Sequence, residues 1–126
     1  AIVLFNEQYE VLVGLSSDAT DVLSRLPTRS RPRGSTYMVF GLLGAKQLLT
    51  ESKRKNYAKP IILLLSDGLS RYPDYSECSI NSQCGLATIA RQVKDSMIDI
   101  FWISYSDEKD EQWPTGTMRS VISSEP

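Results

Sequence analysis

The sequence predicts an α/β fold, a doubly wound and mostly parallel sheet with one antiparallel edge strand. Ala1–Phe5 and Ile61–Leu65 are apolar without alternation, which is typical of strands buried on both faces. Helical segments stand between the later strands, as the crossovers of a parallel sheet require. The link Asn6–Tyr9 is too short for a crossover, so it predicts an antiparallel hairpin whose second strand lies at the sheet edge.

The first part of the chain predicts this hairpin and a short helix. The hairpin strands are expected over Ala1–Phe5 and Glu10–Leu15. The helix is expected over Ala19–Leu26, because Asp18 and the two serines before it offer N-caps and Pro27 stops the helix.

A long helix from about Thr36 to Ser52 leads to the central strand. Its apolar face is expected from residues at helical spacing: Val39, Leu42, Leu43, Leu48 and Leu49, with Phe40 beside them. The basic run Lys53–Lys55 closes the helix, where cations complement the negative helix end. Pro60 then opens the strand Ile61–Ser66, at a position where proline costs no ladder bond.

The last part predicts one more crossover and a terminal helix. After a loop over Leu69–Gly85, a helix is expected over Leu86–Met97 and a buried strand over Ile98–Tyr105. The helix residues expected to face inward are Leu86, Ile89, Ala90, Val93 and Met97. An acidic loop over Ser106–Pro114 and a short helix over Thr117–Ser123 complete the expected elements.

Composition limits the classes of function. The 126 residues fit one domain with a real core, and the net charge of -1 gives no reason to expect nucleic acid or a membrane surface as partner. The longest apolar run is far short of a membrane span. Histidine is absent, which disfavours the common hydrolase triads and zinc sites.

The direction of the elements predicts one site at one edge of the sheet. If Phe5 ends at the top, the arginine-rich loop and Thr36 lie at the top as well. The helix from Thr36 then runs down, and the strand from Pro60 returns to deliver Asp67 beside Thr36. Taken alone, Thr36 is better explained as an ordinary helix N-cap, and Asp67 as a residue that caps the loop after its strand.

Three motifs carry a resemblance to a known family. The stretch Arg33-Gly34-Ser35-Thr36, the pair Gly41-Leu42 and the run Ile62–Gly68 resemble the von Willebrand factor type A domain. The opening hairpin and the closing Ile122–Pro126 fit the same pattern. The resemblance covers the whole chain and implies a Rossmann-like fold.

The resemblance also implies a metal site at the top of the sheet. Thr36 and Asp67 match two of the family's ligands, whose hard oxygens suit Mg²⁺, or Ca²⁺ and Mn²⁺. A carboxylate of a protein partner completes the metal shell in the family. The site is incomplete here, because the family's Asp-x-Ser-x-Ser motif on its first strand does not occur in this sequence.

We therefore expect residues 1–126 to be a single domain that lacks the family's first and last strands. The first strand would lie between Ala1–Phe5 and Ile61–Ser66, and without it two apolar strand edges are exposed. The sequence thus predicts that the rest of a longer chain supplies this strand.

The loop after Asp67 contains the two cysteines of the chain, Cys78 and Cys84. A local disulfide between them would staple the loop and indicate an extracellular location. Two unpaired thiols in a cytosolic loop are the alternative.

Residues on both loops are candidates for partner contacts: Arg29, Arg31, Arg33, Tyr72 and Tyr75. Arginine forks suit an acidic partner, and tyrosines suit a specificity loop. The alternative for the arginines, which have Arg25 nearby, is a solvated loop without a partner.

The leading hypothesis is an extracellular adhesion module of a larger matrix or cell-surface protein, which binds a protein partner and catalyses no reaction. A structural domain that assembles without metal is the alternative. An enzyme that uses Asp67 with Ser66 or Ser70 is a third hypothesis, which the absence of histidine and of a phosphate-binding glycine pattern disfavours.

Overall fold

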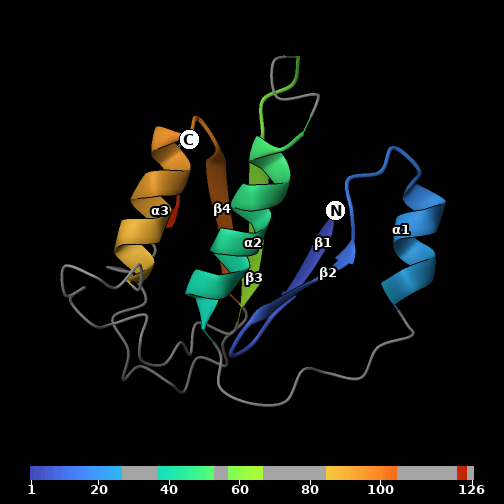
Figure 1. Ribbon diagram of the computed structural model, residues 1–126, viewed down its shortest axis with the longest axis horizontal. Coiled ribbons are helices and arrows are strands. Elements are labelled where there is room, and N and C mark those ends of the chain that lie inside the picture. The colour runs from blue at the N-terminus through green and yellow to red at the C-terminus, as the bar shows by residue number, and fades with distance from the viewer. Residues whose placement is uncertain (27–36, 53–56, 67–84, 105–121, 125–126) are drawn as a thin grey trace.

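Strands and helices alternate along the part of the chain that the computed structural model describes, residues 1–26, 37–52, 57–66, 85–104 and 122–124 (Figure 1). In chain order these elements are β1 (Ile2–Phe5), β2 (Tyr9–Val13), α1 (Ala19–Arg25), α2 (Met38–Thr50), β3 (Ile61–Ser66), α3 (Leu86–Asp95) and β4 (Asp99–Ser104). The α/β class predicted from the sequence is confirmed.

β1 and β2 form the predicted antiparallel hairpin, with Phe5 opposite Tyr9. The turn is held by Asn6, whose backbone N–H donates to the carbonyl of Gln8 at 2.9 Å and whose Oδ1 accepts from the backbone N–H of Gln8 at 3.1 Å. β2 begins one residue earlier and ends two residues earlier than expected, at Val13. The short polar link therefore makes a tight turn, as its length predicts.

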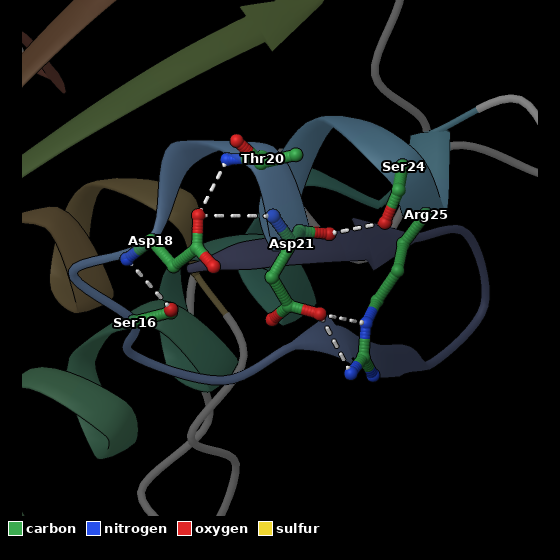
Figure 2. Close-up of polar contacts among 6 residues, drawn as sticks. All are labelled: Ser16, Asp18, Thr20, Asp21, Ser24 and Arg25. Atoms are coloured by element: carbon green, nitrogen blue, oxygen red, sulfur yellow. Dashed lines mark hydrogen bonds and ion pairs between the residues drawn. The ribbon is translucent and has the colours of Figure 1, made fainter.

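α1 begins where the sequence predicts, with Asp18 as its N-cap (Figure 2). Oδ1 of Asp18 accepts from the backbone N–H of Thr20 at 2.8 Å, and Asp21 pairs with Arg25 one turn later at 2.9 Å. None of the α1 residues is buried, and Leu23 is 62% exposed. Local capping and pairing, rather than packing, hold this short helix.

β3 and β4 form a parallel pair in unbroken register, from Ile61 opposite Asp99 to Ser66 opposite Ser104. Only alternate residues of the pair are buried: Ile62, Leu64, Ile100 and Trp102. The prediction that the unalternated run 61–65 is buried on both faces is therefore wrong. The helices that the structure describes cover one face of this pair, so the other face stays exposed.

α2 and α3 cover the buried face and form the core with it. The fully buried side chains on the two helices are Met38, Val39, Leu42, Leu86, Ile89, Ala90 and Val93. Leu43 and Leu49 lie at the margin of this core, half-buried. The expected apolar faces are confirmed at Val39, Leu42, Leu43 and Leu49 of α2 and at Leu86, Ile89, Ala90 and Val93 of α3, and Met38 adds to the core.

Met97, which the sequence places on the inward face of this helix, is the exception. The helix ends at Asp95, and Met97 adopts a left-handed conformation with φ 60°. The sharp turn into β4 directs its side chain outward, where it is 79% exposed. The prediction of an inward Met97 assumed two more helical residues than the chain forms.

The four described strands form two separate two-stranded sheets, β1–β2 and β3–β4, rather than one continuous sheet. α2 contacts both sheets, because it packs on β1, β2 and β3. Within the described residues β1 and β3 are not hydrogen-bonded to each other, and Figure 1 shows β3 behind α2 and β1 to the right of it. The mostly parallel sheet is thus present only in fragments.

The end of the described chain lies against β4. The backbone N–H of Ser124 donates to the carbonyl of Ile100 at 2.8 Å, and Oγ of Ser124 accepts from the N–H of Ile100 at 3.1 Å. Lys94 donates to the carbonyl of Ser123 at 2.8 Å, and Ile122 is buried in the core. These contacts join residues 122–124 to α3 and β4.

No helix in the described ranges has the length and hydropathy needed to cross a membrane.

Candidate functional site

One edge of the molecule, which we call the carboxyl edge, is where β1, β3 and β4 end and where α2 and α3 begin (Figure 1). The backbone N–H of Tyr37, the N-cap of α2, donates to the carbonyl of Asn6 at 3.1 Å, just beyond the end of β1. Gly85, the N-cap of α3, is buried at the same edge. Strand ends and helix N-termini converge here, the usual location of ligand sites in open α/β sheets.

Two glycines of α2 fix the start of this helix close to the hairpin. A Cβ at Gly41 would lie 2.6 Å from Cδ1 of the Phe5 ring, and a Cβ at Gly44 would lie 2.5 Å from Cδ2 of Tyr9. One turn further, the hydroxyl of Tyr9 donates to Oε1 of Gln47 at 2.7 Å. Because there is no room for a side chain at Gly41 or Gly44, the backbone of α2 approaches the aromatic rings of Phe5 and Tyr9 directly.

The two predicted metal ligands, Thr36 and Asp67, lie outside the described residues. Their neighbours in sequence are described: Tyr37 precedes α2, and Ser66 is the last residue of β3. Both neighbours belong to the carboxyl edge. The direction of α2 and β3 on which the shared site depends is therefore the direction predicted.

The other predicted site residues also lie outside the described ranges: Arg29, Arg31, Arg33, Tyr72, Tyr75, Cys78 and Cys84. Arg25, which the sequence places near the arginine-rich loop, is described. Its guanidinium pairs with Asp21 within α1, at 2.9 Å from Nη2 and 3.0 Å from Nε. This pairing offsets its charge, so Arg25 adds little to a positive surface.

Within the described ranges, no cluster of three or more acidic, cysteine or histidine side chains is placed to hold a metal ion. Thr36 and Asp67 provide a hydroxyl and a carboxylate, which are hard donors of the right type but too few for a complete shell of about six oxygens.

Trp102 is a feature that the sequence does not reveal. Its side chain is buried on the core face of β4, and its indole Nε1 has no hydrogen-bond acceptor in the described part of the chain. A buried donor without an acceptor costs about 1–3 kcal/mol. This donor lies on the strand that leads to the carboxyl edge, two residues before its end.

Comparison with known proteins identifies the family of this domain. No curated protein matches the sequence. The profile of the von Willebrand factor type A domain matches residues 1–120. Domains of this family are generally protein-interaction modules, are mostly not catalytic, and often contain a metal site. Because the match spans nearly the whole chain, the protein belongs to the von Willebrand factor type A domain family.

Proposed function

We propose that this domain is an extracellular protein-binding module of a larger matrix or cell-surface protein, and that its partner binds at the carboxyl edge. One observation supports the proposal: α2 starts and β3 ends at this edge, and in the sequence Thr36 directly precedes the N-cap of α2 while Asp67 directly follows β3. A binding site built from such segments needs no catalytic group, which agrees with the family and with the absence of histidine.

A divalent cation, Mg²⁺ or alternatively Ca²⁺ or Mn²⁺, is proposed to mediate this contact. The hydroxyl of Thr36 and the carboxylate of Asp67 would hold it, and an acidic side chain of the partner would bind the same ion. When bound, the ion supplies an electrophilic centre that attracts carboxylates.

The remaining ligands are proposed to come with a further strand. The hydrogen-bonding edges of β1 and β3 are not joined to each other, while both strands pack under α2 and point in the same direction. A parallel strand inserted between them would join the two sheets into one and would end at the carboxyl edge. We propose that a preceding segment of the same protein supplies it.

Two loops are proposed to contribute specificity around the ion. Arg29, Arg31 and Arg33 would attract an acidic partner, and Tyr72 and Tyr75 would add aromatic contacts. A disulfide between Cys78 and Cys84 would reduce the freedom of the second loop and fits an extracellular location.

Isothermal titration of Mg²⁺ into the natural protein tests the metal site. The proposal predicts binding heat that is lost in Asp67→Ala and retained in the control Asp95→Ala, because Asp95 is an exposed residue at the opposite end of α3. Equal heat in both variants would assign the ion to another site. No heat and no thermal stabilisation in the natural protein would contradict the metal site and favour the metal-independent structural domain.

A further inference from the structure

The edge opposite the carboxyl edge, which we call the amino edge, is where β3 and β4 begin and where α2 and α3 end (Figure 1). The two most exposed large apolar side chains of the described residues lie there. Tyr57, which precedes β3, is 88% exposed, and Met97, which precedes β4, is 79% exposed. Tyrosine and methionine are both enriched in the interfaces between proteins.

Met97 stands where the end of a helix usually has glycine. The backbone N–H of Ile98 donates to the carbonyl of Val93 at 3.3 Å, and that of Met97 donates to the carbonyl of Lys94 at 2.8 Å, which together form a Schellman motif. Glycine is usual at the left-handed position of this motif, because a Cβ there is strained. Met97 occupies it with φ 60° and presents its thioether to solvent. Strain of this kind is concentrated at functional positions.

The connections that bear Tyr57 and Met97 lie side by side. The backbone N–H of Asp99 donates to the carbonyl of Pro60 at 3.1 Å, and Nζ of Lys59 pairs with Oδ2 of Asp99 at 2.6 Å. Both charged groups reach solvent, since the side chain of Lys59 is 68% exposed and that of Asp99 is 28% exposed. The amino edge thus has two halves, one with an aromatic ring and a cation before β3, and one with a thioether and a carboxylate at the start of β4.

Each half is complementary to the other half of a second copy. A two-fold axis perpendicular to the strands, passing between the two connections, would place unlike halves opposite each other. Tyr57 would then meet the Met97 of the second copy, and contacts between a thioether and an aromatic ring are favourable. Lys59 would meet the second Asp99. An ammonium has three donors and a carboxylate two acceptor oxygens, so each group can bond within its own chain and across the axis.

We propose that the amino edge is a self-association surface, on which two copies of this chain meet through Tyr57 and Met97 with Lys59 and Asp99 beside them. These few side chains bury less than the roughly 800 Å² per partner of a standard interface, so the contact is weak, with a Kd on the order of 0.1 mM. The two carboxyl edges would point away from each other. The inference goes beyond the proposed function and does not depend on the metal site.

Charge favours a second copy over a membrane surface. Lys59 and Asp99 offset each other, and Asp95 adds an exposed carboxylate at the end of α3. The described part of the amino edge therefore does not attract anionic lipids, which requires a cluster of basic residues. A second copy supplies an acceptor for each cation and a ring for each thioether.

Disulfide trapping in the natural protein tests the arrangement. Tyr57→Cys protein and Met97→Cys protein are mixed in equal amounts in a glutathione redox buffer, and peptide mass spectrometry separates the links from those of Cys78 and Cys84. Unlike halves face each other in the proposed dimer, and a mixed pair keeps one native contact of Tyr57 with Met97. We expect links between positions 57 and 97 to exceed those between like positions at least about tenfold.

Leu23→Cys is the matched control, because Leu23 is 62% exposed and lies on α1, at the far side of the hairpin in Figure 1. Mixed with Met97→Cys, it is expected to link no faster than random collision allows. Links between 57 and 97 in statistical proportion to those between like positions would overturn the proposal. Binding to anionic vesicles or to another protein that is lost in Met97→Gly, without links between 57 and 97, would assign the edge to that partner and overturn it too.

Charge exchange tests the ion pairs across the axis. Lys59→Glu and Asp99→Lys each place like charges opposite each other, so each variant alone is expected to self-associate at least about tenfold more weakly in sedimentation equilibrium. In an equal mixture the introduced glutamate faces the introduced lysine, and self-association should recover. The repulsion within each chain persists in the mixture, so recovery reports only the contact between copies. No recovery, or an unmodified protein that stays monomeric well above the expected Kd, would overturn the two-fold contact.

Discussion

Gly41 of α2 packs directly on the ring of Phe5 in β1, so closely that a Cβ at position 41 would lie 2.6 Å from Cδ1 of the ring. This contact joins the hairpin sheet to the helix that also covers β3. Gly44 makes a similarly close approach to the ring of Tyr9, so both glycines bring α2 onto the hairpin sheet. The separation of β1 from β3 is therefore set by α2, which rests on both.

Gly41→Ala is expected to destabilise the domain by up to about 2 kcal/mol. Overpacking costs about 1–3 kcal/mol, and the better helix propensity of alanine returns about 1 kcal/mol. Denaturant unfolding of the variant measures the loss.

Gly14→Ala is the matched control, because nothing lies within 4 Å of a Cβ at Gly14. It is expected to leave stability unchanged or to raise it by up to about 1 kcal/mol. An equal loss in both variants would show that the contact with Phe5 is not the cause.

Ile122→Ala is expected to cost about 2–5 kcal/mol, because Ile122 is 1% exposed within the core and its removal leaves a cavity. The hydrogen bonds of Ser124 to Ile100 prevent this segment from moving in to fill the space. Thermal unfolding checks the value against Leu23→Ala, which is exposed and should change stability by less than about 0.5 kcal/mol. Similar midpoints for the two variants would contradict the packing of residues 122–124.

Met97→Gly is expected to stabilise the domain by about 1 kcal/mol. Met97 adopts φ 60° after the last turn of α3, a conformation that costs a non-glycine residue about 1–2 kcal/mol, and its exposed side chain loses little packing. Met97→Ala keeps the strain and should leave the unfolding midpoint nearly unchanged. A loss of stability in the glycine variant would indicate that the exposed methionine makes a contact in the natural protein.

Cys78 and Cys84 are expected to form a disulfide in protein isolated from its source. Peptide mass spectrometry with and without reductant detects the link. Two free thiols in native material would remove the support for an extracellular location.

Local signals in the sequence are sufficient to predict the elements. Asp18 caps α1 as its position predicts, and the apolar spacing of Leu86, Ile89 and Val93 gives the buried face of α3. The exact end of a helix is harder to predict from sequence, because the turn after Asp95 depends on how α3 meets β4. The sequence therefore predicts an inward Met97, while the structure directs it to solvent.

The unalternated run of β3 is the more informative difference. Ile61, Leu63 and Leu65 are as apolar as Ile62 and Leu64, and the pattern predicts burial on both faces. The structure buries one face, because its described helices cover only that side. Residues of equal hydropathy thus differ in burial because of which face of the strand they occupy, which the unalternated pattern does not encode.

The sequence predicts the edge at which the candidate site would lie, but not the arrangement of its side chains. Chain direction predicts that α2 starts and β3 ends at one edge, and the structure shows this. Side-chain geometry at Thr36 and Asp67 depends on the connecting segments, on which periodicity and capping signals give no information. The close packing at Gly41 and Gly44 depends on Phe5 and Tyr9, far away in sequence, so neither contact follows from local pattern.

An experimental structure of the natural protein tests the central claim most directly. The account predicts a further strand that runs parallel to β1 and β3 and is hydrogen-bonded to both, which makes the sheet continuous from β2 to β4. A structure in which β1 pairs directly with β3, or in which the two sheets remain apart, would contradict it.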